Sequence, residues 1–405
     1  MALGDIALRL WFVCRREFSA IRGLRAALLA IFLPALLSAC ARPGAESPLR
    51  QVTARASGTT DHTILIATTR KRSADPGALF SGERALELDY AQAVVSVPPT
   101  HKTANIEWPS QQPGNPQTDF VTREAEYLDG EKEFIARLNQ ELAQRPPGHR
   151  NVMLFVHGYN TLFPEGLYRL TQVAHDAKAQ AVPVYFSWAS RGELQGYVYD
   201  QNSATAARDG LEHTIRMIAA SNVEHINILA HSMGNWVTVE AFRNIRISGT
   251  PVKGGAAKVG TIVLASPDID VDVFRSQMYR IGAPKKPYLI VLSRDDRALA
   301  LSRFIAGDKD RLGDYRNAAD LTKFGAVVVD LSDLKSSDPI NHDKFAEIAT
   351  IAPQLQEVLA EGVGKASPDE GAGSTGGATE VVKTVLTLPV AMVAAPIVVI
   401  ARQVQ

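Results

Sequence analysis

The chain contains very little cysteine. Two of its 405 residues are cysteines, Cys14 and Cys40, and both lie in the first tenth of the sequence. Cysteines at one end of a chain cannot cross-link a folded core. The fold must therefore be held together by packing alone.

An excess of charge of either sign is also missing. Lysine plus arginine number 43, as do aspartate plus glutamate, so the formal net charge is +0. No basic patch is interleaved with aromatic residues, and no overall field draws the chain to nucleic acid. We expect no nucleic-acid partner.

Sequence motifs for metals and phosphates are lacking as well. There is no His-x-x-x-His or Cys-x-x-Cys spacing, and the glycine-rich stretch at residues 371–377 lacks the Walker pattern. We therefore expect no metal and no cofactor. The composition, 46% hydrophobic and 21% charged, is ordinary for a globular protein with one large core.

Residues 1–39 resemble the signal peptide of a bacterial lipoprotein. An apolar run at residues 26–37, too short for a comfortable membrane span, follows a positive region that contains Arg15, Arg16, Arg22 and Arg25. The run ends in Leu37-Ser38-Ala39-Cys40, which resembles the lipobox, where a diacylglycerol is attached to the cysteine before cleavage. We expect lipidation of Cys40; the alternative is an uncleaved N-terminal anchor helix.

The segment after this cysteine has the composition of a linker. Residues 40–60 are rich in proline, glycine and small polar side chains, and they predict a tether that holds a domain off a membrane. Ala41 stands where an aspartate would resemble the inner-membrane retention signal of such lipoproteins. We expect a lipid-anchored protein of the bacterial cell envelope, in the outer membrane and facing the periplasm.

Strand-like and helical patterns alternate over residues 61–361. Apolar runs without period-two alternation, typical of strands buried on both faces, lie at residues 152–156, 184–188, 226–230, 261–265, 288–293 and 326–331. Helical patterns lie at residues 131–143, 165–180, 203–220, 232–246, 271–280 and 344–359. Two earlier strands, 63–69 and 93–97, precede a loop at 98–119. The order predicts an α/β domain with a mostly parallel sheet and helices on both faces.

Two further segments follow this domain. Residues 362–380 are rich in glycine, alanine and serine and predict a flexible linker. Residues 381–405 form an apolar tail, interrupted by Pro389 and Pro396. One interpretation of the tail is a second membrane contact, although two prolines and a modest length argue against a regular spanning helix.

The strongest chemical signal is a strand that turns abruptly into a helix at a serine. The segment Ile228-Leu229-Ala230-His231-Ser232-Met233-Gly234-Asn235 resembles the nucleophile elbow of α/β-hydrolases, which exposes the serine hydroxyl above the sheet. Ala230 takes the place of the first glycine of G-x-S-x-G, and one methyl group is tolerable there. The alternative is a serine that only caps a helix.

A second signal is an apolar strand that ends in His157-Gly158-Tyr159-Asn160. In the superfamily the corresponding loop supplies one backbone donor of the oxyanion hole, so the resemblance implies the N–H groups of Tyr159 and Met233 as the two donors. We assign His157 to packing or orientation of this loop rather than to proton transfer.

The chain order serine, acid, histidine then indicates the base. His342 is the only histidine after Ser232, and it lies in a turn-rich loop between the last strand and the last helix. In α/β-hydrolases the general base occupies this place. We therefore predict His342 as the base.

The acid is harder to select because aspartates are numerous. Asp296 is our choice, since Asp296-Arg297-Ala298-Leu299 fits the superfamily's Asp-x-x-Val spacing after the strand at 288–293. Asp295 is the nearest alternative, and Asp268 or Asp270 is the second. For Asp268 a capping or bracing role is favoured over catalysis.

Residues 63–359 as a whole resemble a bacterial branch of the superfamily catalogued as the domain of unknown function number nine hundred. The resemblance rests on the segments Ala67–Arg70, Phe155–Asn160, Phe186–Trp188, Tyr197–Asp200, Ala265–Asp270 and Asp296–Leu299, together with the Ser232 elbow. It implies the α/β-hydrolase fold with a minimal lid, because residues 266–286 have room for little more than one helix. The loop at 189–202 is then the expected wall of an open site.

These assignments imply a serine hydrolase that forms an acyl-enzyme on Ser232. Trp188, Tyr197 and Tyr199 either line an apolar acyl or aryl pocket or pack the sheet edge. The expected substrate is a small-molecule or lipid carboxylic ester, as for an esterase or lipase, with a peptidase or thioesterase as alternatives. A non-catalytic envelope lipoprotein that uses the fold as a binding module is the competing class.

Overall fold

A computed structural model describes residues 48–255, 258–282, 284, 286–336, 338–348, 381–390 and 393–402. Within these ranges no helix is both long enough and apolar enough to cross a bilayer. Four predicted features lie outside the described residues. They are the signal peptide, the Cys40 lipidation site, the linker at 362–380 and the end of the helix predicted at 344–359.

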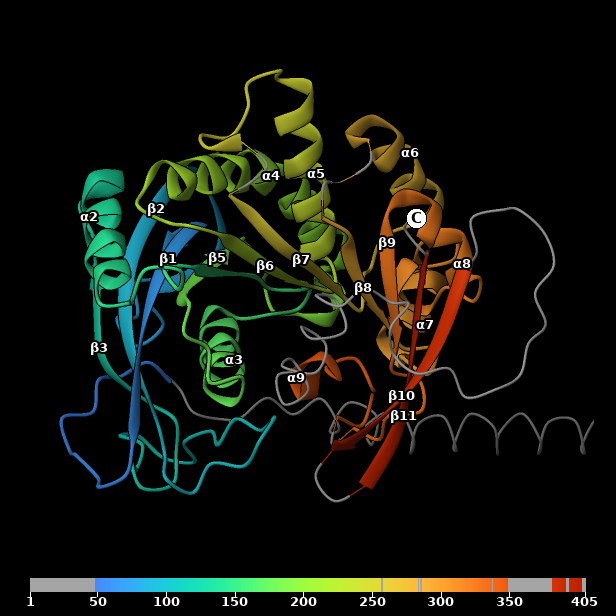
Figure 1. Cartoon of the computed structure of the whole chain (residues 1–405). Helices are drawn as coiled ribbons and strands as arrows, with labels where there is room; N and C mark the ends of the chain where they lie inside the picture. The colour runs from blue at the N-terminus through green and yellow to red at the C-terminus, as the bar shows by residue number, and fades with distance from the viewer. Residues whose placement is uncertain are drawn as a thin grey trace, which may run out of the picture. The chain divides into compact units, whose positions relative to one another are not determined.

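One mixed sheet forms the centre of the fold (Figure 1), with the strand order β10-β11-β9-β8-β7-β6-β4-β5-β1-β2-β3. The strands are β1 Thr60–Arg72, β2 Phe80–Val97, β3 Val121–Tyr127, β4 Val152–Val156, β5 Val182–Ser187, β6 Ile226–His231, β7 Val259–Ala265, β8 Tyr288–Leu292, β9 Ala326–Asp330, β10 Val381–Val390 and β11 Val393–Arg402. The central strands pair in parallel, in the order β1, β5, β4, β6, β7, β8 and β9. Antiparallel pairs extend the sheet at both edges.

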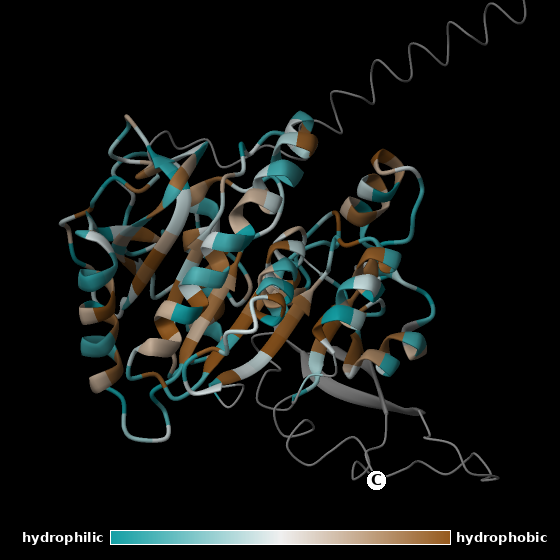
Figure 2. Cartoon of the chain, turned by 90° about the horizontal axis from the view of Figure 1, so that it is seen from above, coloured by the Kyte–Doolittle hydropathy of each residue, from teal (hydrophilic) through white to brown (hydrophobic). Residues whose placement is uncertain are grey.

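Helices cover both faces of this sheet (Figure 1). They are α2 Gly130–Ala143, α3 Phe163–Asp176, α4 Tyr197–Ala220, α5 Gly234–Ile247, α6 Val271–Ile281, α7 Arg297–Ile305, α8 Ala318–Leu321 and α9 Phe345–Ile348. One core lies between the sheet and α2, α4, α5 and α6, and a second lies between the sheet and α3 and α9. Figure 2 shows the hydrophobic residues concentrated on the strands that these two layers enclose. The predicted two-sided α/β architecture is therefore confirmed.

Several elements differ from their predicted extent. β2 begins at Phe80 instead of residue 93, and β3 was not predicted. Both strands lie toward one edge of the sheet, and their burial pattern is irregular, so they lack the continuous apolar signal of the central strands. The predicted loop at 189–202 is shorter than expected, because a 3₁₀ turn at Leu194–Gly196 leads directly into α4 at Tyr197.

The described part of the predicted tether at 40–60 contains two buried residues. Leu49 and Val52 are 1% and 4% exposed, and Leu49 belongs to the core on the α3 side. Their backbone N–H groups donate to Gly77 O and Thr122 O. These two apolar side chains therefore pack on the domain, while residues 50, 51 and 53–55 around them are exposed.

The predicted apolar tail contains two strands. β10 and β11 pair with each other, and Val398–Ile400 of β11 pair with Val328–Asp330 of β9. A strand at this edge satisfies the backbone groups of β9 that would otherwise face solvent. The described part of the tail therefore extends the sheet and is not a helix.

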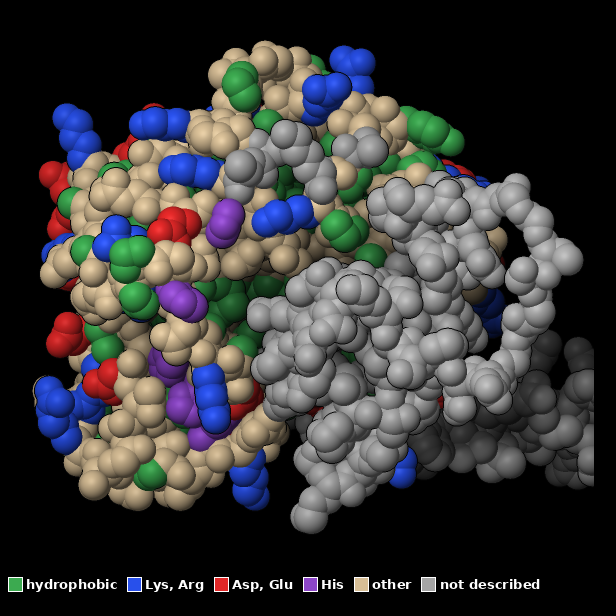
Figure 3. Space-filling model, viewed as in Figure 1, with side chains coloured by type: hydrophobic (Ala, Val, Ile, Leu, Met, Phe, Trp, Pro, Cys, Tyr) green, Lys and Arg blue, Asp and Glu red, His purple; other side chains and the backbone are tan. Residues whose placement is uncertain are grey.

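A cluster of histidines joins the loop at 98–119 to α3. His62 Nε2 lies 3.1 Å from His175 Nδ1, and His101 bonds Asp176 at 2.9 Å and Glu107 at 2.7 Å. Figure 3 shows histidine side chains gathered on one part of the face that it draws. The cluster holds the loop against the helix with polar contacts.

Candidate active site

The serine of the predicted elbow has a strained backbone. Ser232 follows β6 directly and has a φ of 52°, in the left-handed region that non-glycine residues rarely adopt. Strain of this kind persists only where the surroundings enforce it. The strand-turn-helix geometry around Ser232 is the kind that projects a serine hydroxyl beyond the sheet edge.

Close contact between helix and strand explains the glycine two residues later. A Cβ on Gly234 would lie 2.3 Å from His157 O and 2.5 Å from Val156 O. Only glycine allows α5 to begin this close to β4. At the first small position of the motif, Ala230 is fully buried inside β6, so its methyl group is accommodated.

Asn235 braces the elbow, a role that the sequence analysis did not assign. Its side-chain amide donates to Ser232 O and to Ala265 O, both at 2.9 Å. The backbone N–H of Ser232 also donates to Ala265 O, at 3.0 Å. The asparagine thus ties the turn to β7, and its place directly after Gly234 was the available signal.

His342 and Asp296 meet at the same edge of the sheet. Nδ1 of His342 lies 2.7 Å from Oδ2 of Asp296, while Oδ1 of Asp296 accepts a hydrogen bond from Leu299 N–H at the start of α7. Asp296 is 2% exposed. The helix cap fixes the carboxylate, and the carboxylate fixes the imidazole ring.

The pKa of His342 is raised to about 9. Burial alone would lower it, but the charge and hydrogen bond of Asp296, with smaller contributions from Asp343 and Asp268, outweigh the burial. The imidazolium is therefore strongly stabilised at this position, as a general base that receives a proton requires.

The other aspartates considered as the acid have different partners. Asp295 binds Lys344 Nζ at 2.8 and 2.9 Å, and Asp270 caps α6. Asp268 accepts from Ser302 Oγ at 2.6 Å and from Tyr197 OH at 3.2 Å, and it lies 3.3 Å from Arg311 Nε. Among the four candidates, Asp296 is the one hydrogen-bonded to His342.

The loop that carries His342 is fastened to the elbow. The carbonyl of His342 accepts from Ser266 Oγ at 3.1 Å and lies 3.3 Å from His231 Nε2, and the rings of His231 and His342 are 4.6 Å apart. His231 immediately precedes Ser232. Between described residues no hydrogen bond joins Ser232 Oγ to His342; in ligand-free enzymes such contacts are often long and tighten with substrate.

The predicted oxyanion loop passes directly beside the serine. A Cβ on Gly158 would lie 2.7 Å from Ser232 Cβ, so this glycine permits the close approach. Tyr159 follows, and its hydroxyl donates to Leu194 O and to Glu193 O. Met233 precedes the first helical residue of α5, where amides have no partner within the helix. Met233 therefore adjoins Ser232 in the chain, and Tyr159 follows the glycine that approaches Ser232.

His157 is a packing residue in the structure, as expected. It is 1% exposed, its ring stacks on Trp188 at 4.9 Å, and its Nε2 accepts from Trp188 N–H at 3.1 Å. Burial, together with the charge of Arg70, holds the pKa of His157 well below its ordinary value. The ring is therefore neutral and enclosed.

The three aromatic residues proposed for substrate contact are placed differently from one another. Trp188 is fully buried, and its indole N–H donates to His157 O at 2.7 Å, which favours the packing alternative. Tyr199 donates to Gly82 O at 3.2 Å and lies under the Arg191 guanidinium, beside β2. Tyr197 is 7% exposed and packs on Tyr159 at 5.2 Å. Of the three, Tyr197 is the one whose ring packs on Tyr159.

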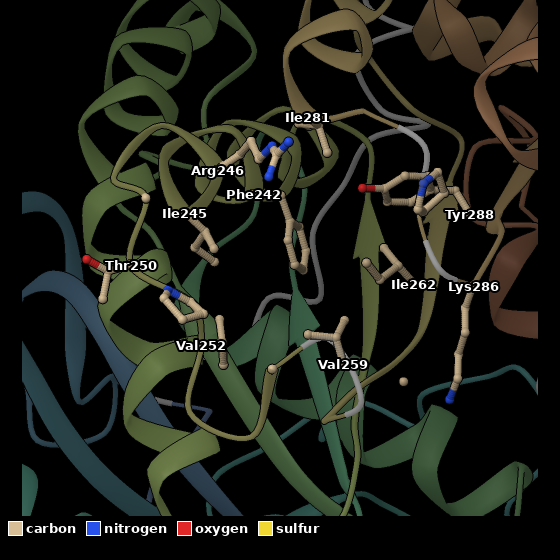
Figure 4. Close-up of a pocket in the computed structure, with 15 residues that line it drawn as sticks. Phe242, Ile245, Arg246, Thr250, Val252, Val259, Ile262, Ile281, Lys286 and Tyr288 are labelled. Carbon is tan, nitrogen blue, oxygen red and sulfur yellow. The ribbon is translucent and has the colours of Figure 1, made fainter.

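A pocket of about 340 Å³, drawn in Figure 4, is lined by none of these residues. Its walls include Phe242 and Ile245 near the end of α5, and Val259 and Tyr288 at the first residues of β7 and β8. Ser232 lies at the carboxyl end of the parallel strands, and the pocket lies at their amino ends. The pocket therefore shares no residue with the candidate site. Among the described side chains, no group of three or more His, Cys, Asp or Glu residues could hold a metal ion.

The fold and the elbow define the chain as an α/β hydrolase. The family model for the alpha/beta hydrolase of unknown function, DUF900, matches residues 131–360, more than half of the chain, and the chain belongs to this family. The resemblance seen in the sequence is thereby confirmed, and the protein is a hydrolase by family. No curated protein matches the chain.

One similar solved structure comes from a study of two fungal esterases from Rhizomucor miehei and their substrate specificity. It shares 13% identity, covers 75% of this chain and 85% of that chain, and has a TM-score of 0.31. At that similarity the match adds nothing to what the family establishes.

Proposed function

We propose that the protein is a serine hydrolase that cleaves carboxylic esters through Ser232, His342 and Asp296. The observation that carries the proposal is the 2.7 Å contact between His342 and Asp296 at the strand edge where Ser232 sits in a left-handed turn. A capping serine would not require a buried carboxylate–imidazole pair beside it. The combination supports nucleophilic catalysis.

The proposed reaction begins when His342 Nε2 accepts the proton of Ser232 as Oγ attacks the ester carbonyl carbon. The N–H groups of Tyr159 and Met233 stabilise the oxyanion, and one such donor typically lowers the barrier by about 3 kcal/mol. Collapse breaks the bond to the alcohol, which takes the proton from His342. Water, deprotonated by the same imidazole, then releases the acid and restores Ser232.

Two alternatives remain as outcomes of the test. A peptidase or thioesterase would use the same residues on an amide or thioester, and it would prefer those substrates to esters. A binding module would use the fold without chemistry. The one helix between β7 and β8, α6, leaves a minimal lid, which suits an open site for small esters or lipid esters.

A fluorophosphonate probe tests the proposal. We expect the full chain to be labelled, and Ser232→Ala to lose both labelling and hydrolysis of acyl esters. Ser248→Ala, at the other end of α5, is the matched control and should keep both. A folded wild-type protein that is not labelled, or a Ser232→Ala variant with full activity, would contradict the proposal.

We further propose that Cys40 carries a lipid anchor in the bacterial cell envelope, on the outer membrane and facing the periplasm. The lipobox-like Leu37-Ser38-Ala39-Cys40 supports this, as does Ala41 at the following position. The substrate would then be a soluble or lipid ester within reach of the membrane surface.

A further inference from the structure

A buried arginine lies behind the loop that carries Tyr159. Arg70, near the end of β1, is fully buried. Its guanidinium donates to Ser187 Oγ at 2.8 Å and to three carbonyls: Ser190 O at 2.9 Å, Thr161 O at 2.8 Å and Ser81 O at 3.2 Å. Burial lowers the pKa of Arg70. A buried guanidinium stays charged only where several hydrogen bonds, as here, replace its contacts with water.

A buried carboxylate holds the same region from the other side. Asp200 on α4 is fully buried and accepts from Ser190 Oγ at 2.5 Å, from Arg191 N–H at 3.1 Å and from Asn160 N–H at 3.1 Å. Every oxygen of this carboxylate thus has a donor. The contacts reach from the helix to the residue directly after Tyr159.

Ser190 connects the two charged groups. Its hydroxyl donates to Asp200 and accepts from Thr161 N–H at 3.0 Å, while its carbonyl accepts from Arg70. Thr161 is therefore held at both its N–H and its carbonyl. Asn160, between these contacts and Tyr159, has a φ of 55° and is held by Asp200.

We propose that Arg70, Ser190 and Asp200 are positioning residues that fix the Tyr159 amide as an oxyanion donor. The inference rests on the proposed function and extends it to residues that touch neither substrate nor triad. Gly158, on one side of Tyr159, is set against Ser232, and residues 160 and 161, on the other side, are held by the three buried side chains. The peptide between them has little freedom to turn.

Such a role predicts an effect on the transition state rather than on substrate binding. The oxyanion exists only after Ser232 attacks, so a displaced donor lowers kcat and leaves KM nearly unchanged. A misplacement of about 1 Å can cost around 100-fold in rate. The His342–Asp296 pair is untouched, so the pH dependence should not move.

Asp200→Asn is the main test, because the side chain keeps its size while one acceptor becomes a donor. We expect kcat for an acyl ester to fall about 10- to 100-fold with KM within about twofold of wild type. Affinity for an alkyl boronic acid, whose anionic tetrahedral adduct needs the oxyanion donors, should fall in parallel. Asp209→Asn on the same helix, where the carboxylate is exposed, is the control and should change neither quantity.

Ser190→Ala is a second variant, in case Asp200→Asn fails to fold. It removes the hydroxyl contacts to Thr161 N–H and to Asp200 but leaves the Asp200 contact to Asn160, so it should lower kcat and boronate affinity in the same way, by a smaller factor. Unchanged kcat and boronate affinity in a folded variant would overturn the inference, as would a change confined to KM. A wild-type protein that fluorophosphonate does not label would instead overturn the proposed function. Failure of the positioning role and failure of the proposed function are therefore distinguishable.

Discussion

At the scale of single residues, the site depends on which carboxylate reaches His342. Asp295 and Asp296 are neighbours in the sequence, yet one binds Lys344 and the other binds the imidazole. The difference follows from the start of α7, where Asp296 is the N-cap residue and its carboxylate accepts from Leu299 N–H. Local helix capping therefore orients the acid.

Replacement of this acid gives the first prediction. Asp296→Asn should lower kcat by about 10³- to 10⁴-fold, because an amide in place of the carboxylate no longer holds the imidazole in the productive tautomer. Asp295→Asn should lower kcat by less than about tenfold. Steady-state ester hydrolysis by both variants decides the assignment, and a larger loss in Asp295→Asn would refute it.

The raised pKa of His342 gives a second prediction. The general base must be neutral, so kcat/KM should increase as pH rises and reach a plateau above about 9, where His342 loses its proton. Asp343→Asn should shift the midpoint to lower pH, because the Asp343 charge helps to raise this pKa. Asp272→Asn on the exposed start of α6 should not shift it. A midpoint that stays near 6.5 in the wild type would argue against this electrostatic picture.

At the scale of elements, the elbow requires β6, β4 and α5 to approach closely. Gly234→Ala would force the Cβ into the carbonyls of Val156 and His157, which are backbone atoms that cannot move aside cheaply. We expect the free energy of unfolding to fall by more than about 2 kcal/mol, as is typical of overpacking. Gly196→Ala, whose Cβ would meet atoms no nearer than 3.8 Å, is the control for chemical denaturation. Equal stability of the two variants would show that the close contact is relieved.

The histidine cluster between β1, α3 and the loop at 98–119 predicts acid sensitivity. Burial, and then the neighbouring His175, lower the pKa of His62 to about 4. Between pH 6.5 and 4 the unfolded chain binds a proton at His62 that the folded chain does not, so stability should fall as pH falls through this window. The expected loss is on the order of 1–3 kcal/mol.

Denaturant unfolding at pH 7 and pH 4.5 measures this effect. His62→Gln should lose less stability than the wild type over the same range, because glutamine does not titrate. His213→Gln, on the exposed side of α4, should behave as the wild type does. An identical pH response in His62→Gln and wild type would exclude His62 as the source.

At the scale of the whole molecule, we propose that membrane attachment and hydrolysis depend on different parts of the chain. The lipid anchor at Cys40 would provide the attachment, and the α/β domain would provide the activity. Cys40→Ser should abolish labelling by an alkynyl fatty acid and release the protein from the membrane fraction, with ester hydrolysis retained. Cys14→Ser should keep the label, because the proposed cleavage removes residue 14. Labelling that survives in Cys40→Ser would contradict the anchor.

Much of the fold was predictable because its signals are local. The central strands are buried on both faces, so each is a continuous apolar run, and the helices between them carry a helical period. β2 and β3 near one edge have mixed burial and were missed or shortened. The hairpin of β10 and β11 escaped prediction because its pairing with β9 joins segments far apart in the chain.

The order of motifs, by itself, predicted the proposed nucleophile, the proposed base and the loop beside them, since chain order and short spacings carry that information. Tertiary structure separated Asp296, the aspartate chosen from the sequence, from its three alternatives. It alone decided that Trp188 is enclosed and that Arg70, Ser190 and Asp200 converge behind Tyr159. The hydrogen bonds that hold residues 160 and 161 span 29 to 91 residues of chain. No local pattern encodes them, because they exist only once the sheet brings the ends of its strands to one edge.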